Sequence, residues 1–133
     1  MTCRGIRGAV CAEANDLEAI IRATSDLLER IVAANGVDVD DVASVIFTAT
    51  TDLDTAYPAR AAREMGWVNT PLLCMQEMAV EASLPRCIRV LIHWNTDRDR
   101  QEIQHVYLGA ARALRPDLVA PTTSDTSSAR ESI

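Results

Sequence analysis

The sequence predicts an α+β fold, in which a mixed β-sheet of about five strands carries one long helix on a face. The helix is predicted because apolar residues recur at helical spacing through residues 15–35. Four other segments have the apolar, β-branched composition of strands: 3–11, 42–50, 71–78 and 87–96. We expect the sheet to be mixed or largely antiparallel.

Size and composition predict the domain organisation. The chain has 133 residues, of which 48% are hydrophobic and 24% are charged, as in an ordinary globular domain. Residues 1–118 are predicted to form that single domain. Residues 119–133 contain few apolar side chains, so we expect them to form a polar, mobile tail.

The first predicted strand, 3–11, contains two arginines and two glycines. Arg4 and Arg7 have opposite parity, so in a regular strand their side chains point to opposite faces of the sheet. One arginine is therefore expected at the surface and the other in a pocket. The glycines permit close approach of a neighbouring backbone.

The predicted helix, 15–35, is bounded by residues that commonly begin and end helices. Asn15, followed by Glu18, gives a start that resembles a capping box. Asn35 and Gly36 give a stop. The apolar stripe of this helix is expected to cover one face of the sheet.

The remaining elements follow from shorter patterns. Segment 42–50 is β-branched and nearly continuously apolar, as expected for a strand in the middle of a sheet. Pro58 can begin a short helix through Met65, which Gly66 closes. Segment 105–114 combines a strand-like start with a helix-like end, and we assign it as the fifth strand.

Composition argues against several classes of function. The net charge of −6 opposes binding to nucleic acid. All 13 basic residues are arginine, so Schiff-base chemistry by lysine is excluded. The four cysteines form no CxxC pair, which argues against a zinc site or a disulfide framework. The sequence lacks the ~20-residue apolar run of a membrane span and an apolar signal-peptide segment, so we expect a cytoplasmic protein.

Two charged residues lie within apolar strands. Arg89 follows Cys87 and Ile88, and Glu77 lies near the end of segment 71–78. Such a charge must reach solvent, find a partner or face a ligand, because burying it alone is very costly. On these residues alone we favour a mutual salt bridge or a strand edge in water, with a ligand site as the alternative.

Six short motifs occur in order along the chain: RGIRGA (4–9), YPA (57–59) followed by Arg63, CMQEM (74–78), CIRV (87–90), HVYL (105–108) and LRPDL (114–118). Together they resemble the monofunctional chorismate mutases of the Bacillus type. The likeness spans residues 1–118. It implies a homotrimer arranged as a pseudo-α/β-barrel, with active sites between subunits. It also implies conversion of chorismate into prephenate for phenylalanine and tyrosine biosynthesis, without metal or cofactor.

The resemblance assigns catalytic and binding roles to individual residues. Arg89 would contact the ether oxygen and a carboxylate of chorismate, and Arg7 would bind on the carboxylate side. Glu77 and Cys74 would meet the ring hydroxyl, Cys74 by its side chain or by its backbone alone. Tyr107 would donate a hydrogen bond to a carboxylate.

Other residues would form the walls of the pocket. Leu114 and Arg115 would close its mouth. A neighbouring subunit would contribute the remaining lining residues: Tyr57, Ala59, Arg60, Arg63 and Leu73.

Arginine suits the implied reaction, in which one C–O bond breaks as one C–C bond forms without a covalent enzyme intermediate. A fixed guanidinium can hold the reactive conformer and stabilise negative charge on the ether oxygen. Glu77 would orient the ring without acting as a base. Two alternatives remain: a trimeric module that binds or senses a small carboxylate without converting it, and another enzyme of the same shape, such as an imine deaminase.

Overall fold

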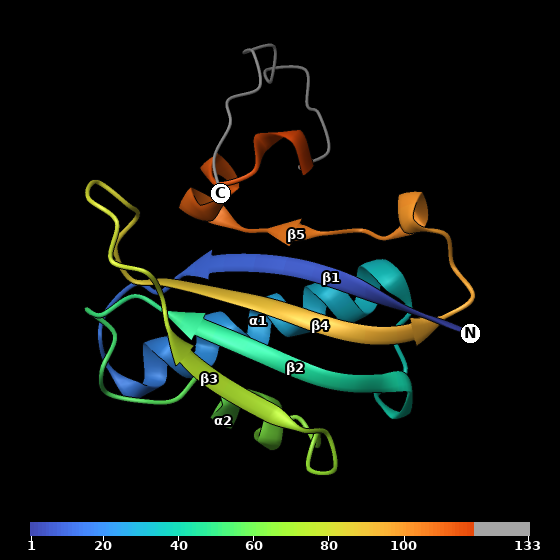
Figure 1. Cartoon of the computed structure of the whole chain (residues 1–133). Helices are drawn as coiled ribbons and strands as arrows, with labels where there is room; N and C mark the ends of the chain where they lie inside the picture. Colours follow the sequence, from blue (N-terminus) through green and yellow to red (C-terminus); the bar gives the residue numbers. More distant parts are fainter. Residues whose placement is uncertain (119–133) are drawn as a thin grey trace.

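The computed structural model describes residues 1–118, which form one five-stranded sheet of order β3-β2-β4-β1-β5 (Figure 1). Its strands are β1 (Thr2–Cys11), β2 (Val42–Ala49), β3 (Leu72–Gln76), β4 (Cys87–Thr96) and β5 (Val106–Tyr107). β4 is antiparallel to β1 and β2, whereas the edge strands β3 and β5 run parallel to β2 and β1. The predicted mixed sheet is confirmed. The predicted tail, 119–133, lies outside the described residues.

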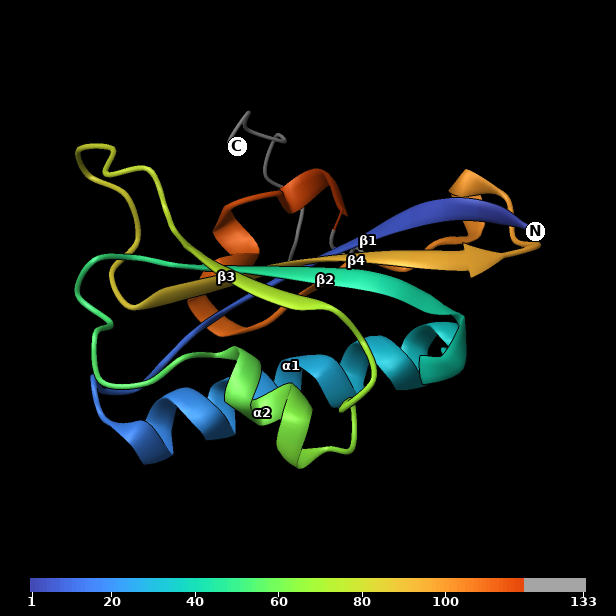
Figure 2. The same cartoon turned by 60° about the horizontal axis from the view of Figure 1, so that its bottom comes forward.

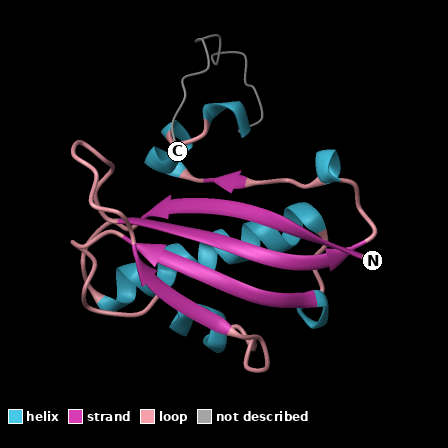
Figure 3. Cartoon of the chain, in the orientation of Figure 1, coloured by secondary structure: helices cyan, strands magenta, loops and turns pink. Residues whose placement is uncertain are grey.

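Two helices cover the same face of the sheet, the long α1 (Leu17–Asn35) and the short α2 (Ala59–Glu64) (Figure 2). Helix α1 ends at Gly36, whose φ of +70° is readily adopted by glycine. The long helix on one face is therefore confirmed. Residues 1–118 also contain four short 3-10 turns (Figure 3): η1 (Val39–Asp41), η2 (Arg100–Glu102), η3 (Gly109–Ala113) and η4 (Pro116–Leu118).

The cap of α1 differs by one residue from the prediction. Asp16 caps the helix, because its side chain accepts a hydrogen bond from the amide of Ala19 at 2.7 Å. Asn15 instead forms two side-chain hydrogen bonds with Asp54. Its side-chain Nδ2 donates to the Asp54 carboxylate at 2.7 Å, and its side-chain Oδ1 accepts from the backbone amide of Asp54 at 3.1 Å. A long-range contact thus replaces the local capping role of Asn15.

The main core lies between the sheet and α1. Its fully buried members come from alternate strand positions and from one stripe of the helix: Ile6, Val45, Phe47, Ile88, Ile92, Ile20, Leu27, Leu28 and Ile31. Burying each such side chain contributes about 1.5–3 kcal/mol, before the entropy of ordering the chain is counted. The described residues contain no helix long and apolar enough to cross a membrane.

The sheet face away from α1 is covered only in part. A small cluster of Ala9, Tyr107 and Ala111 is buried there, with Leu114 packed against it. Farther across the face, Leu73 and Met75 of β3 are 53% and 47% exposed. One region of this face is therefore apolar and open within a single chain.

The prediction for segment 105–114 is wrong over most of its length. Only Val106–Tyr107 pairs as a strand, and η3 follows at once. Gly109, with φ of +55°, turns the chain out of the extended conformation. Ala111 is then buried against Ala9 and Tyr107. The local pattern of this segment favours both strand and helix, and tertiary packing determines where the strand ends and the 3-10 turn begins.

A stability prediction concerns Gly8, where β1, α1 and β5 converge. An added Cβ would lie 2.8 Å from Cδ1 of Ile31 and 3.1 Å from the carbonyl oxygen of Val106. We predict that Gly8→Ala lowers the free energy of unfolding by about 1–3 kcal/mol, through overpacking. Urea denaturation measures the effect. Gly5→Ala is the matched control, because its Cβ would meet Leu91 at an ordinary 3.4 Å; equal losses in both variants would contradict the prediction.

Candidate active site

An ion pair with additional hydrogen bonds lies on the sheet face away from α1. The Nε and Nη2 atoms of Arg89 donate to the two carboxylate oxygens of Glu77, each at 2.6 Å. The Thr48 hydroxyl donates to Oε2 of Glu77 at 2.7 Å, and the Met78 amide donates to Oε1 at 3.2 Å. A two-pronged arginine–carboxylate pair is strong and directional. The mutual salt bridge favoured from the sequence is therefore present.

Strand register brings Thr48, Glu77 and Arg89 together. Thr48 of β2 lies directly opposite Arg89 of β4. Glu77 follows β3, and its amide donates to the carbonyl of Ala49 at 2.9 Å, which extends the β2–β3 ladder. Because strand side chains alternate between faces, all three functional groups emerge on the same side.

The pair also sets the charge state of both partners. The hydrogen bonds from Arg89 lower the pKa of Glu77 from its ordinary 4.5 to about 2, against an opposing effect of burial and with further lowering by Thr48. The same contact raises the pKa of Arg89. Both groups are therefore ionised at neutral pH.

Beside the pair is a hollow of about 400 Å³. Its lining residues come from β1, β2, β4 and β5: Arg7, Gly8, Ile46, Thr48, Arg89, Val90, Leu91 and Tyr107. Among residues 1–118, no carboxylate forms an ion pair with Arg7, whereas Arg89 is held by Glu77. The hollow thus combines two arginines with a phenol, which suits an anionic ligand.

Tyr107 lines this hollow, and His105 contacts the backbone of Arg7 beside it. Burial raises the pKa of Tyr107, while the nearby charges of Arg7, Arg115 and Arg89 lower it. The ring Nδ1 of His105 accepts a hydrogen bond from the backbone amide of Arg7 at 2.9 Å. Burial, then Arg7 and Arg115, lower the pKa of His105. The neutral imidazole therefore acts as an acceptor that fixes the Arg7 backbone.

The two arginines of β1 lie on opposite faces, as predicted from their parity. Arg7 lines the hollow. Arg4 pairs in register with Trp94, a member of the main core, and its Nε donates to the carbonyl of Arg98 at 3.2 Å.

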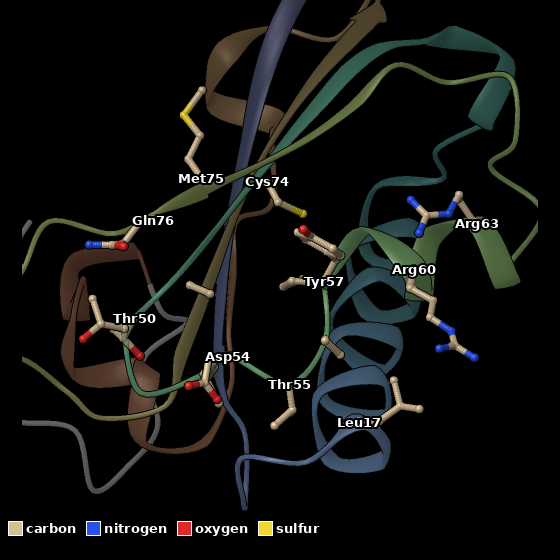
Figure 4. Close-up of a pocket in the computed structure, with 15 residues that line it drawn as sticks. Leu17, Thr50, Asp54, Thr55, Tyr57, Arg60, Arg63, Cys74, Met75 and Gln76 are labelled. Atoms are coloured by element: carbon tan, nitrogen blue, oxygen red, sulfur yellow. The ribbon is translucent and has the colours of Figure 1, made fainter.

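A second hollow, of about 660 Å³, contains several of the other predicted site residues (Figure 4). Tyr57, Arg60, Arg63 and Cys74 line it, and none of its lining residues lines the first hollow. Arg60 pairs with Glu64 at 2.8 Å on the surface of α2. Within one chain, the predicted site is therefore divided between two places.

Cys74 lies in the second group. It is in register with Phe47 of the main core, and the backbone amide of Ala59 hydrogen-bonds to its thiol. Burial raises the pKa of this thiol. The sequence interpretation placed Cys74 with Glu77, but within one chain the two side chains lie on opposite faces of the sheet, because strand positions alternate.

The remaining predicted residues lie near one group or the other. Ala59 is buried at the start of α2, next to the second hollow. Leu73 is exposed on the open sheet face and lines neither hollow. Leu114 packs against the cluster that contains Tyr107. Arg115 pairs with Asp117 at 2.7 Å.

Sequence reasoning missed Thr48 in this site. The signal was a hydroxyl in an apolar, β-branched strand, but only the register shows that it lies opposite Arg89. Across residues 1–118, no group of three or more histidine, cysteine, aspartate or glutamate side chains is placed to hold a metal ion.

Comparison with known proteins identifies the family. The model of the family described as chorismate mutase type I matches residues 3–118. The chain belongs to this family. Chorismate mutase AroH from Thermus thermophilus is 51% identical to it over 116 residues, which cover 86% of this chain and 95% of that relative.

Two further chorismate mutases show the same likeness. Chorismate mutase AroH from Bacillus subtilis is 44% identical over 119 residues, 89% of this chain and 94% of that relative. A solved chorismate mutase from Clostridium thermocellum matches with a TM-score of 0.81 at 49% identity, over 83% of this chain and 98% of that chain. The family and activity predicted from the six motifs are confirmed, and so is the α+β fold class predicted from the sequence pattern.

The Glu77–Arg89 pair predicts how stability depends on pH. The pKa of Glu77 is lowered on folding, so its contribution is fully present above its ordinary pKa of 4.5 and is lost as the pH falls toward about 2. Glu77→Gln removes this titration. We predict that the difference in free energy of unfolding between the parent and Glu77→Gln shrinks over that range, measured by urea denaturation at several pH values.

An exposed ion pair supplies the control for this measurement. Glu64→Gln removes the partner of Arg60, and both side chains are 52% exposed. Such pairs contribute little, so this variant should differ from the parent only slightly at every pH. A difference for Glu77→Gln that stays constant as the pH falls would show that Glu77 does not titrate as described.

Proposed function

We propose that this chorismate mutase rearranges chorismate to prephenate by holding the reactive conformer and stabilising charge at the ether oxygen with Arg89. The observation that carries the proposal is the hollow in which a fixed Arg89 lies beside Arg7 and Tyr107. Chorismate carries two carboxylates and an ether oxygen. Two arginines and a phenol supply the cationic and hydrogen-bonding groups that such a substrate needs.

Arg89 is preorganised for this role. Glu77 uses two of its five N–H donors, which leaves three for the substrate. Because the guanidinium is already oriented, no reorganisation is required when negative charge develops on the ether oxygen. An interaction that is stronger in the transition state than in the bound substrate raises the rate rather than only the affinity.

Glu77 suits an orienting role better than a general-base role. Its pKa of about 2 keeps it ionised at neutral pH. An efficient general base has a pKa near the working pH, so a carboxylate with this pKa removes protons poorly. An intramolecular rearrangement also needs no proton transfer to the enzyme. Glu77 would then hold Arg89 and accept a hydrogen bond from the ring hydroxyl.

We also propose that the enzyme is a homotrimer with active sites between subunits. Two observations support this arrangement: the predicted site residues form two separate groups on one chain, and Leu73, Met75 and Tyr57 are exposed near them. A closed ring of head-to-tail contacts would bring one group against the other group of the next chain. The four cysteines are free, which fits a cytoplasmic location.

Replacing Arg89 tests the catalytic assignment. We predict that Arg89→Ala folds but loses about 10²–10³-fold in kcat, the usual loss when one preorganised donor is removed. The loss of chorismate's ultraviolet absorbance measures turnover. Arg22→Ala is the control, since Arg22 forms an exposed ion pair with Glu18 on α1. Normal turnover by Arg89→Ala would refute the assignment, and a parent protein that leaves chorismate unchanged would favour a carboxylate-binding module or another enzyme.

Mixing inactive variants tests the shared site. If Arg89 and Arg63 meet from different chains, co-refolding equal amounts of Arg89→Ala and Arg63→Ala should restore about a quarter of the parent activity by random assembly. A mixture of Arg89→Ala and Arg7→Ala is the control. Both of those residues line the same hollow of one chain, so no intact site can form. Equal recovery in the two mixtures, or none in either, would contradict the arrangement.

A further inference from the structure

We propose that Thr48 is a positioning residue for the rearrangement, because its hydroxyl fixes the Glu77 carboxylate that holds Arg89. The catalytic consequence rests on the proposed function. The contact itself is a property of the substrate-free protein and can be measured without turnover.

The geometry gives Thr48 a specific place in the cluster. Oε2 of Glu77 accepts both the Thr48 hydroxyl at 2.7 Å and Nε of Arg89 at 2.6 Å. Oε1 accepts Nη2 of Arg89 and the amide of Met78. An ionised carboxylate offers about four acceptor sites. The contact from the Met78 amide, at 3.2 Å, is the longest of the four, and the ring hydroxyl would take its place. The Thr48 hydroxyl is the one donor that comes from the central strand β2.

Glu77 needs such an anchor because of its place in the chain. β3 ends at Gln76, and the connection to β4 begins with Glu77 itself. By contrast, Thr48 lies inside β2 and pairs directly with Arg89 of β4. Its backbone is paired on both sides, with Met75 of β3 and Arg89 of β4, so its hydroxyl is held beside the carboxylate. The hydroxyl therefore holds the Glu77 carboxylate, which follows the end of β3, against the interior strands β2 and β4. A fixed carboxylate in turn fixes the plane of the Arg89 guanidinium.

The electrostatic surroundings of Glu77 make the contact measurable. Arg89 and Cys87 approach it from β4, while Arg7 of β1 and Tyr107 of β5 lie across the hollow. Among the uncharged groups, the Thr48 hydroxyl lowers the pKa of Glu77 most, and the Met78 amide lowers it less. Removing its hydroxyl should therefore raise the pKa of Glu77 and leave every formal charge in place.

The test compares variants at two positions of β2 that differ in what their hydroxyls contact. Thr48→Val removes the hydroxyl and keeps the shape, and Thr48→Ser keeps the hydroxyl. Ser44→Ala is the matched control, because Ser44 contacts Nδ1 of His93 at 2.9 Å instead of Glu77. The measurements are kcat and KM for chorismate over a range of pH, and a ¹³C NMR titration of Glu77 without substrate.

For Thr48→Val we expect kcat to fall roughly tenfold with a smaller change in KM, the scale expected for one hydrogen bond to a charged group. The pKa of Glu77 should rise, so the acid limb of the activity profile moves to higher pH. Thr48→Ser should restore both properties, and Ser44→Ala should change neither. Thr48→Ala gives the same expected results and serves as the test if Thr48→Val does not fold.

Several outcomes would overturn the inference. One is parent-like kcat and an unchanged Glu77 pKa in Thr48→Val. Another is an equal loss in Thr48→Val and Thr48→Ser, which would indicate packing and not the hydroxyl. A parent protein that does not convert chorismate overturns the proposed function itself, whereas an active parent with an unaffected Thr48→Val overturns only the role of Thr48.

Discussion

The alternation of side chains along β4 is the constraint on which both the core and the site depend. Ile88, Val90 and Ile92 face α1 and form the main core, while Arg89 between them faces away from the helix. A shift of pairing by one residue would bury the guanidinium and expose the isoleucines. The core packing that sets the register of β4 therefore also determines that the Arg89 side chain points toward the hollow.

The Arg89–Glu77 pair is better explained by function than by stability. Moving two charges out of water costs free energy that their attraction only partly offsets, and apolar replacements of such pairs are often as stable. Here the side chains are 24% and 16% exposed, so the pair is largely removed from solvent. The proposed role of Arg89 in the hollow beside it would account for this cost, because a partly desolvated, oriented cation interacts more strongly with an anion than one in water does.

Much of the fold was predictable because the strongest signals in the sequence are periodic. The apolar stripe of α1 and the β-branched strands depend on local spacing, and the structure follows them. Local spacing could not place the cap of α1, because Asn15 is held by Asp54 from a distant turn. It also could not decide segment 105–114, where Gly109 and the burial of Ala111 end the strand.

The site was predictable only as a set of residues. The motifs named Arg7, Glu77 and Arg89, and the structure brings these three to one face. Sequence could not show that Cys74 belongs to a different hollow or that Thr48 contacts Glu77, because both facts depend on which strands are neighbours. Strand order is a long-range property that no single segment encodes.

Gly8 lies between the main core and the hollow that Arg7 and Tyr107 line. It has no side chain, so β5 can approach β1 in parallel register, with Gly8 opposite Val106 and Ala9 opposite Tyr107. Any side chain at this position would push against the Val106 carbonyl, and hence against the strand that carries Tyr107. A substitution at Gly8 would therefore disturb the packing against Ile31 and, at the same time, the position of the strand that borders the hollow.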